Sequence, residues 1–95
     1  MNVKKIKVDN NVLYGYTQKL HNKTLLFLTG SRGYIMCGYL NMETADKFED
    51  VAIKVTGVSS IDEMLSARAD EVSVCARKIG ISKGQKIKDI LPIIA

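Results

Sequence analysis

The chain has 95 residues, of which 46% are hydrophobic and 25% charged, and its net charge is +4. These values are typical of one globular domain spanning residues 1–95, and they exclude a disordered chain. The longest apolar runs are far shorter than the roughly 20 residues that cross a bilayer, so no membrane partner is expected. Two cysteines without a secretory signal indicate free thiols and predict a cytoplasmic protein.

The charge is unevenly distributed along the chain. Residues 1–32 carry six Lys or Arg against one Asp, residues 33–75 eight acids against three bases, and residues 76–95 five bases against one Asp. The segments therefore have net charges of +5, −5 and +4. This asymmetry is compatible with nucleic-acid binding and with complementary surfaces in an assembly. Because no aromatic-plus-basic module of a nucleic-acid binder is present, the assembly is favoured.

The first forty residues predict an antiparallel meander of four strands. β-branched, aromatic and other apolar residues dominate the segments Val3–Val8, Val12–Leu20, Thr24–Thr29 and Tyr34–Leu40. Residues typical of turns separate these segments. Gly15, inside the second segment, is a candidate β-bulge.

After the fourth strand the hydrophobic period changes, and a strand–helix–strand unit is predicted. Asn41 is expected to cap a helix over 42–50, and Val51–Val55 is expected to be a buried strand. If this strand lies in the same sheet as the fourth, the two are parallel and end at the same edge. Because open sheets bind ligands at such carboxyl ends, the turns 40–44 and 56–60 form the predicted site.

The remaining residues predict two helices. Ser60 and Glu63 have the spacing of a capping box, and apolar residues then recur at helical spacing over 61–79, which predicts a helix of about five turns. Gly80 suits its end.

Ser82 and Gln85 form a second, weaker capping box before a short last helix, which Pro92 is expected to end. The predicted fold class is therefore α+β, with a four-stranded antiparallel N-terminal region, one strand–helix–strand unit and two C-terminal helices packed on the sheet.

Three motifs carry a resemblance to a known family. They are CGYLN in the fourth strand, TGV after a buried strand, and GI-x-x-G before the last helix, and they occur in that order. Together they resemble the YunC-like family, a domain of unknown function in bacteria and archaea. The resemblance implies a small α+β domain whose N-terminal β region mediates tetramerisation, and it implies no activity, cofactor or catalytic residue. Residues 1–23 are then the oligomerisation strands, and residues 24–95 are the α+β core.

Cys37 is the candidate catalytic residue. As a nucleophile it would need a nearby base or helix N-terminus, whereas a cysteine packed in an apolar strand is inert. We expect the inert state. His21, the only histidine, has no cysteine or carboxylate at ligand spacing, and Cys75 lies elsewhere, so no metal site is predicted.

Hydrogen-bonding groups gather at the two turns, and helix starts attract anions. The candidate ligand-binding residues are Asn41, Thr44, Thr56, Gly57, Ser59 and Ser60. Asp62 and Glu63 would repel a phosphate, and no Walker-type lysine follows. A capped helix after a strand, without a ligand, is therefore favoured over a site for a small polar or weakly anionic ligand, and the cofactor is unknown.

Three functions follow from the sequence. The leading hypothesis is a self-assembling domain, with the tetramer favoured, that has a small-ligand or regulatory role. The second is an enzyme that uses Cys37 and the two turns, and the third is a nucleic-acid binder.

Overall fold

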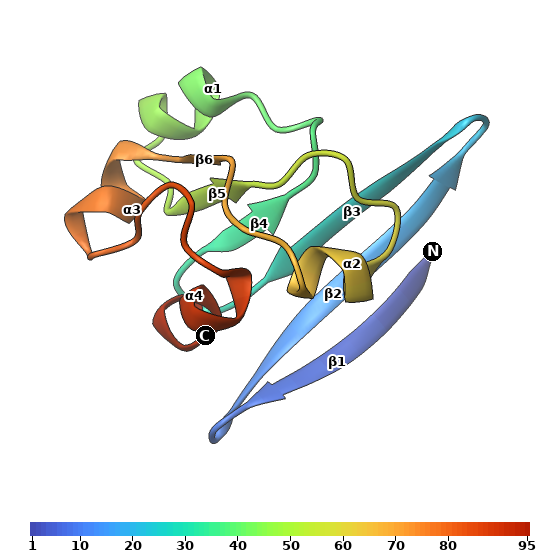
Figure 1. Cartoon of the computed structure of the whole chain (residues 1–95), viewed down its shortest axis with the longest axis horizontal. Coiled ribbons are helices and arrows are strands. Elements are labelled where there is room, and N and C mark those ends of the chain that lie inside the picture. The colour runs from blue at the N-terminus through green and yellow to red at the C-terminus, as the bar shows by residue number, and fades with distance from the viewer.

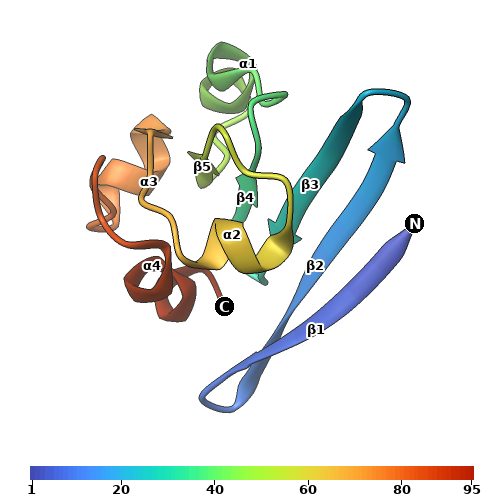
Figure 2. The same cartoon turned by 45° about the vertical axis from the view of Figure 1, so that its right-hand side comes forward.

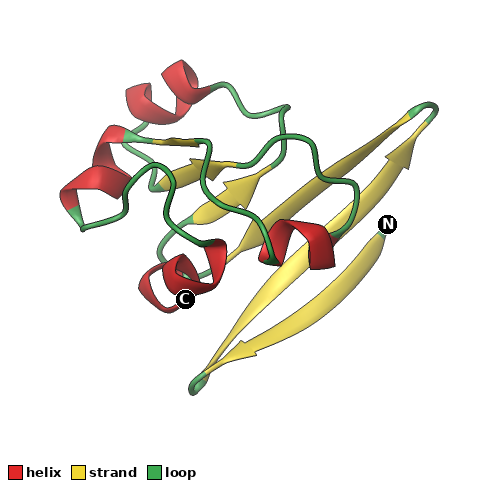
Figure 3. Cartoon of the chain, in the orientation of Figure 1, coloured by secondary structure: helices red, strands yellow, loops and turns green.

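Six strands form one mixed sheet, in the order β1-β2-β3-β4-β5-β6, in the computed structural model, which describes residues 1–95. The fold is α+β, as predicted, and its four helices are short (Figures 1 and 3). The elements are β1 (Asn2–Val8), β2 (Asn11–Leu20), β3 (Lys23–Thr29), β4 (Tyr34–Met36), α1 (Met42–Lys47), β5 (Ala52–Lys54), α2 (Ile61–Leu65), β6 (Glu71–Val72), α3 (Val74–Lys78) and α4 (Ile87–Ile94).

The pairing of the first five strands confirms the predicted topology. β1 to β4 are antiparallel neighbours, and β4 pairs in parallel with β5, with Ile35 opposite Ile53. The turn between β1 and β2 contains Asp9 at a φ of 55°, a left-handed conformation that aspartate tolerates better than most side chains. β1, β2 and β3 are long and extend beyond the helices as a twisted ribbon (Figure 1).

The fourth and fifth strands are shorter than predicted. β4 was expected to continue to Leu40 but ends at Met36, because the chain turns at Gly38. The Leu40 N–H donates to the Cys37 carbonyl at 3.2 Å and closes this turn. β5 likewise covers three of the five residues expected.

The five-turn helix predicted over 61–79 is wrong, since this segment forms α2, β6 and α3. The Asp70 N–H donates to the Lys54 carbonyl and the Ser73 N–H donates to the Ala52 carbonyl, both at 2.9 Å. These bonds pair β6 with β5 and occupy the backbone groups that a continuous helix would use.

The predicted cap of α2 is confirmed, with one difference. The Ser60 hydroxyl accepts from the Glu63 N–H at 3.1 Å. In a capping box the Glu63 carboxylate would bind the Ser60 N–H, but it accepts from Ser59 instead. Gly80, at a φ of +96°, follows the end of α3.

The predicted boundaries of the last helix are wrong at both ends. The Gln85 side chain accepts from the Ser82 N–H at 3.1 Å, but α4 begins only at Ile87. Pro92 lies inside α4, which continues to Ile94. Proline removes only its own N–H, and the complete burial of Ile94 in the core favours the additional helical residues.

One hydrophobic core joins the sheet to α2, α3 and α4. Leu13, Ile35 and Ile90 are among its fully buried members. Gly15 forms no bulge, because the pairing of β2 is continuous on both sides. A Cβ at Gly15 would lie 3.1 Å from the Ile61 side chain, so glycine lets α2 pack close to the sheet. No helix is long and apolar enough to cross a membrane.

Ser73 is the one buried polar side chain, and it joins three parts of the chain. Its hydroxyl donates to the Asp50 carbonyl at 2.7 Å. The same oxygen accepts from the Ala52 N–H at 3.0 Å and from the Ala76 N–H at 3.1 Å. Ser73 therefore caps α3 and satisfies the first N–H of β5.

Ser73→Ala should lower the free energy of unfolding by about 2–3 kcal/mol, because it removes a cap and leaves buried backbone groups without partners. Ser60→Ala is the matched control. It removes an exposed cap and should cost about 1 kcal/mol. The measurement is urea unfolding of both variants, and equal midpoints would contradict the role of Ser73.

Candidate functional site

A cleft of about 340 Å³ opens at the carboxyl ends of β4 and β5, where the sequence predicted a site. The segments that follow β4 and β5 diverge there, after the hydrogen bond from the Val55 N–H to the Met36 carbonyl at 2.8 Å. The cleft is lined by Lys23, Thr24, Cys37, Gly38, Tyr39, Gly57 and Val58. The turn after β5 thus meets residues 37–39, a few residues earlier than the expected turn 40–44.

Cys37, one residue beyond β4, lines this cleft and is 4% exposed. Its sulfur lies 3.5 Å from the Leu26 N–H, which donates to it. No imidazole or carboxylate lines the cleft to accept the thiol proton, and Lys23 is its only charged residue. No group of three or more His, Cys, Asp and Glu side chains is placed to hold a metal ion.

The predicted ligand donors at the start of each turn are engaged within the chain. The Thr56 N–H and hydroxyl both donate to one Asp70 carboxylate oxygen, at 2.6 and 2.8 Å. The Asn41 side-chain oxygen accepts from the Thr44 N–H at 3.1 Å, which confirms the cap of α1. None of these three candidates lines the cleft.

The later residues of the second turn are divided between the cleft and its surroundings. Ser59 donates from its hydroxyl and its N–H to Glu63, at 2.6 and 3.0 Å, and these bonds lower the pKa of the Glu63 carboxyl. Ser60 accepts from the backbone of the same residue. Of the six candidate ligand-binding residues, only Gly57, at a φ of +75°, lines the cleft beside Cys37.

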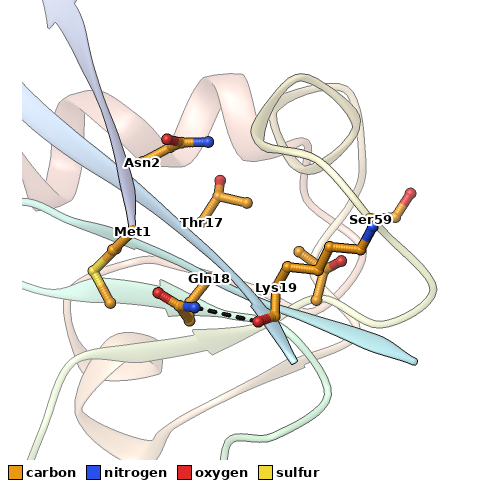
Figure 4. Close-up of a pocket in the computed structure, with 7 residues that line it drawn as sticks. Met1, Asn2, Thr17, Gln18, Lys19 and Ser59 are labelled. Atoms are coloured by element: carbon orange, nitrogen blue, oxygen red, sulfur yellow. Dashed lines mark hydrogen bonds between the residues drawn. The ribbon is translucent and has the colours of Figure 1, made fainter. Parts of the chain in front are cut away.

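A second, more polar pocket of about 420 Å³ lies beside Ser59 (Figure 4). It is lined by Met1, Asn2, Thr17, Gln18, Lys19, Thr24 and Ser59. The pairing of Asn2 with Thr17 brings its two strands together. Within it the Gln18 amide donates to the Lys19 carbonyl at 3.2 Å.

The sequence analysis missed part of the cleft wall. Lys23 and Thr24 reach it from the start of β3, and no local pattern marks them as site residues. Tyr39 and Val58 also line it, and both adjoin glycines in the motifs CGYLN and TGV. Those motifs were therefore the available signal for the cleft.

A third cavity, of about 270 Å³, lies at the opposite, amino ends of β4 and β5. The Tyr34 hydroxyl there donates to an Asp50 carboxylate oxygen at 2.8 Å. Partial burial, this hydrogen bond and the Asp50 charge together raise the pKa of Tyr34 to about 12. The bond fastens the start of β4 to the connection that leads into β5.

Asp50→Asn should lower the pKa of Tyr34 toward the ordinary value of about 10, because the negative charge is lost. The folded pKa of Tyr34 exceeds the unfolded value, so its contribution to stability is present below pH about 10 and is lost toward pH about 12. The ring-carbon NMR shifts of Tyr34 across this pH range measure the effect. The same titration curve in both proteins would contradict it.

Cys37 should be unreactive in the folded protein, because it is buried and no base adjoins it. A Cys75→Ser variant leaves Cys37 as the only thiol, and a Cys37→Ser variant leaves the partly exposed Cys75 as the control. The thiols of both variants are labelled with and without denaturant. Cys37 should react more slowly than Cys75 in the folded protein, and this difference should disappear in denaturant. Labelling at the rate of free cysteine would show an accessible nucleophile.

Comparison with known proteins identifies the chain's relatives. It is 28% identical over 95 residues to the uncharacterised protein YunC of Bacillus subtilis, covering 96% of this chain and 94% of YunC. The crystal structure of TA1206, a protein of unknown function from Thermoplasma acidophilum, is 40% identical with a TM-score of 0.94, covering 99% of this chain and 92% of that one. The sequence model of the family described as "Domain of unknown function (DUF1805)" matches residues 36–93. The resemblance inferred from the motifs is therefore confirmed, and the chain belongs to this YunC-like family.

Proposed function

We propose that this chain is a cytoplasmic self-assembling domain, with a tetramer favoured, in which β1 and β2 form the contacts. We further propose that it binds a small polar ligand in the cleft at the carboxyl ends of β4 and β5. The proposed assembly rests on one observation: the ribbon of β1, β2 and β3 has an exposed face with apolar side chains, and β1 has an unpaired edge.

The free edge belongs to β1, the first strand of the sheet. All seven of its residues pair with β2, and its other side has no partner strand. An edge of this length is a template for pairing with a second chain. Lys4, Lys5 and Lys7 protect it in part, but Lys4 is held by Asp62 at 2.6 Å.

The apolar face lies on the side of the ribbon opposite α2. Val3, Tyr16 and Phe27 are opposite one another across β1, β2 and β3, and the rings of Tyr16 and Phe27 stack with centroids 4.7 Å apart. Beside this row, Val12 and Tyr14 are 40% and 38% exposed. Figures 1 and 2 show α2 on the other face of the ribbon. Lys5 and Lys7 lie on the same face, opposite Tyr14 and Val12. An exposed face that combines apolar, tyrosine and a few basic side chains is typical of a protein interface.

The charges of the chain favour contacts between copies. The segment 1–32 has a net charge of +5 and contains the ribbon, whereas the segment 33–75 has a net charge of −5. A basic ribbon on one copy is complementary to the acidic middle segment of another. The tetramerisation implied by the family resemblance supports the same arrangement.

The ligand proposal rests on the composition of the cleft. Gly38 and Gly57 leave backbone groups accessible, Tyr39 and Val58 supply apolar contacts, and Lys23 supplies one positive charge. Apolar contacts combined with a few polar groups are usual for small-molecule sites. Of the six candidate ligand-binding residues, Gly57 lines the cleft. The hydrogen bonds of the other five hold the two turns in position.

The two alternative functions have less support. An enzyme based on Cys37 would need a base that the cleft does not supply, although its thiol does line the cleft. A nucleic-acid binder would use the basic ribbon, and salt-dependent binding to random duplex DNA would favour it over the assembly.

The assembly is tested by Val3→Glu combined with Tyr14→Glu. Both side chains lie on the exposed face, so the substitutions should leave the core intact. Substitution is preferred to deletion of the strands, because deletion of β2 would remove the fully buried Leu13. Burial of two carboxylates in an apolar contact is costly and should convert the oligomer to a monomer of 10.5 kDa. Light scattering at micromolar concentration and moderate salt measures the mass, and circular dichroism verifies the fold.

Phe48→Glu is the matched control, because Phe48 is an apolar side chain 69% exposed just after α1 and outside the ribbon. It should leave the oligomer unchanged. A monomeric parent protein would refute the assembly. An oligomer that persists in the double variant would refute the assignment to this face.

A further inference from the structure

A cationic cavity of about 300 Å³ lies between the end of α2 and the start of α4. These two helices lie side by side in both views of the molecule (Figures 1 and 2). The lining residues are Leu65, Ser66, Ala67, Arg68, Lys86 and Lys88. Three of the six are cationic, none is acidic, and none lines the cleft beside Cys37.

Two of these cations are held directly opposite one another by the backbone. Arg68 and Lys86 are the partners of an isolated antiparallel β-bridge. Backbone hydrogen bonds of 2.9 and 3.0 Å, made by the adjacent residues, flank this pair on both sides. Arg68 and Lys86 are therefore a non-hydrogen-bonded pair, the arrangement with Cα atoms only about 4.5 Å apart and side chains closest. Like charges in such a pair are unfavourable.

No carboxylate in the chain forms an ion pair with these side chains. The two ion pairs of the structure are Lys4–Asp62 and Lys54–Glu71, and neither involves the cavity. The Arg68 guanidinium donates to the neutral Gly84 carbonyl at 3.0 Å, which orients it without neutralising it. The acidic residue of the first turn of α4, Asp89, does not line the cavity.

We propose that this cavity binds the phosphate group of a small organic phosphate monoester. The guanidinium of Arg68 and the ammonium groups of Lys86 and Lys88 match the charge and the donor pattern of phosphate oxygens. Leu65 and Ala67, both partly buried, supply an apolar wall for the organic part of the ligand. The start of α4 has no side-chain cap, and the positive end of this helix also favours an anion nearby.

The test is an NMR titration of the full-length chain with phenyl phosphate, with sodium chloride at equal ionic strength as the reference. The amide signals of Arg68, Lys86 and Lys88 should shift and saturate with phenyl phosphate. Inorganic phosphate should bind at the same residues but more weakly, because it makes no contact with the apolar wall. Equal shifts with chloride would overturn the proposal, and tighter binding of inorganic phosphate would overturn the assignment to a monoester.

Lys86→Gln should raise the Kd for phenyl phosphate about tenfold, since it removes one charge-assisted contact. Lys83→Gln is the matched control, because it removes the same charge from an exposed position three residues away, outside the cavity. An equal loss in both variants would show only general electrostatic attraction and overturn the site.

A second measurement needs no ligand. Lys86→Gln removes the repulsion with Arg68, so the melting temperature of the free variant should equal or exceed that of the parent protein. A lower melting temperature would show that Lys86 is stabilised by contacts within the chain. That result would also overturn the proposal.

Discussion

The parallel pairing of β4 with β5 is the constraint on which the other features of the molecule depend. Ile35 and Ile53 are opposite one another in this pair and are fully buried at the centre of the core. Parallel strands need a crossover, which α1 supplies, and they end at the same edge of the sheet. The cleft with Cys37 therefore opens at one end of the pair, and at the other end the Tyr34–Asp50 hydrogen bond joins the start of β4 to the connection that leads into β5.

Polar side chains hold these short strands in place. Asp70 precedes β6 and binds the N–H and hydroxyl of Thr56, just beyond the end of β5. Ser73 follows β6 and accepts from the N–H of Ala52, where β5 begins. Three-residue strands bury little surface and make few backbone bonds. The hydrogen bonds of Asp70 and Ser73, on either side of β6, hold both ends of β5 and compensate for its short length. Because Ser73 is buried, loss of its hydrogen bonds would be costly.

The ribbon, the cleft and the cationic cavity differ in polarity and charge. The ribbon of β1, β2 and β3 presents apolar side chains such as Val3 and Tyr14 on the face opposite α2. The cleft has mixed walls and one lysine, and the cavity between α2 and α4 is cationic. The cleft and the cationic cavity share no residue, so an assembly through the ribbon, a ligand in the cleft and an anion near α4 could coexist in one protein. The α2 helix packs on the inner face of the ribbon and contributes Leu65 to the cationic cavity.

Local patterns in the sequence were sufficient for the first half of the fold. Period-two hydrophobicity and turn residues predicted β1 to β3, and the caps at Asn41 and Ser60 follow from contacts only three residues long. The tertiary structure decided what the same patterns leave open. The apolar spacing over 61–79 fits a helix, but β5 pairs with the backbone around Asp70 and Ser73 and divides the segment. The cleft wall likewise depends on β3, which lies beside Cys37 only through strand register, a non-local property that no window of sequence contains.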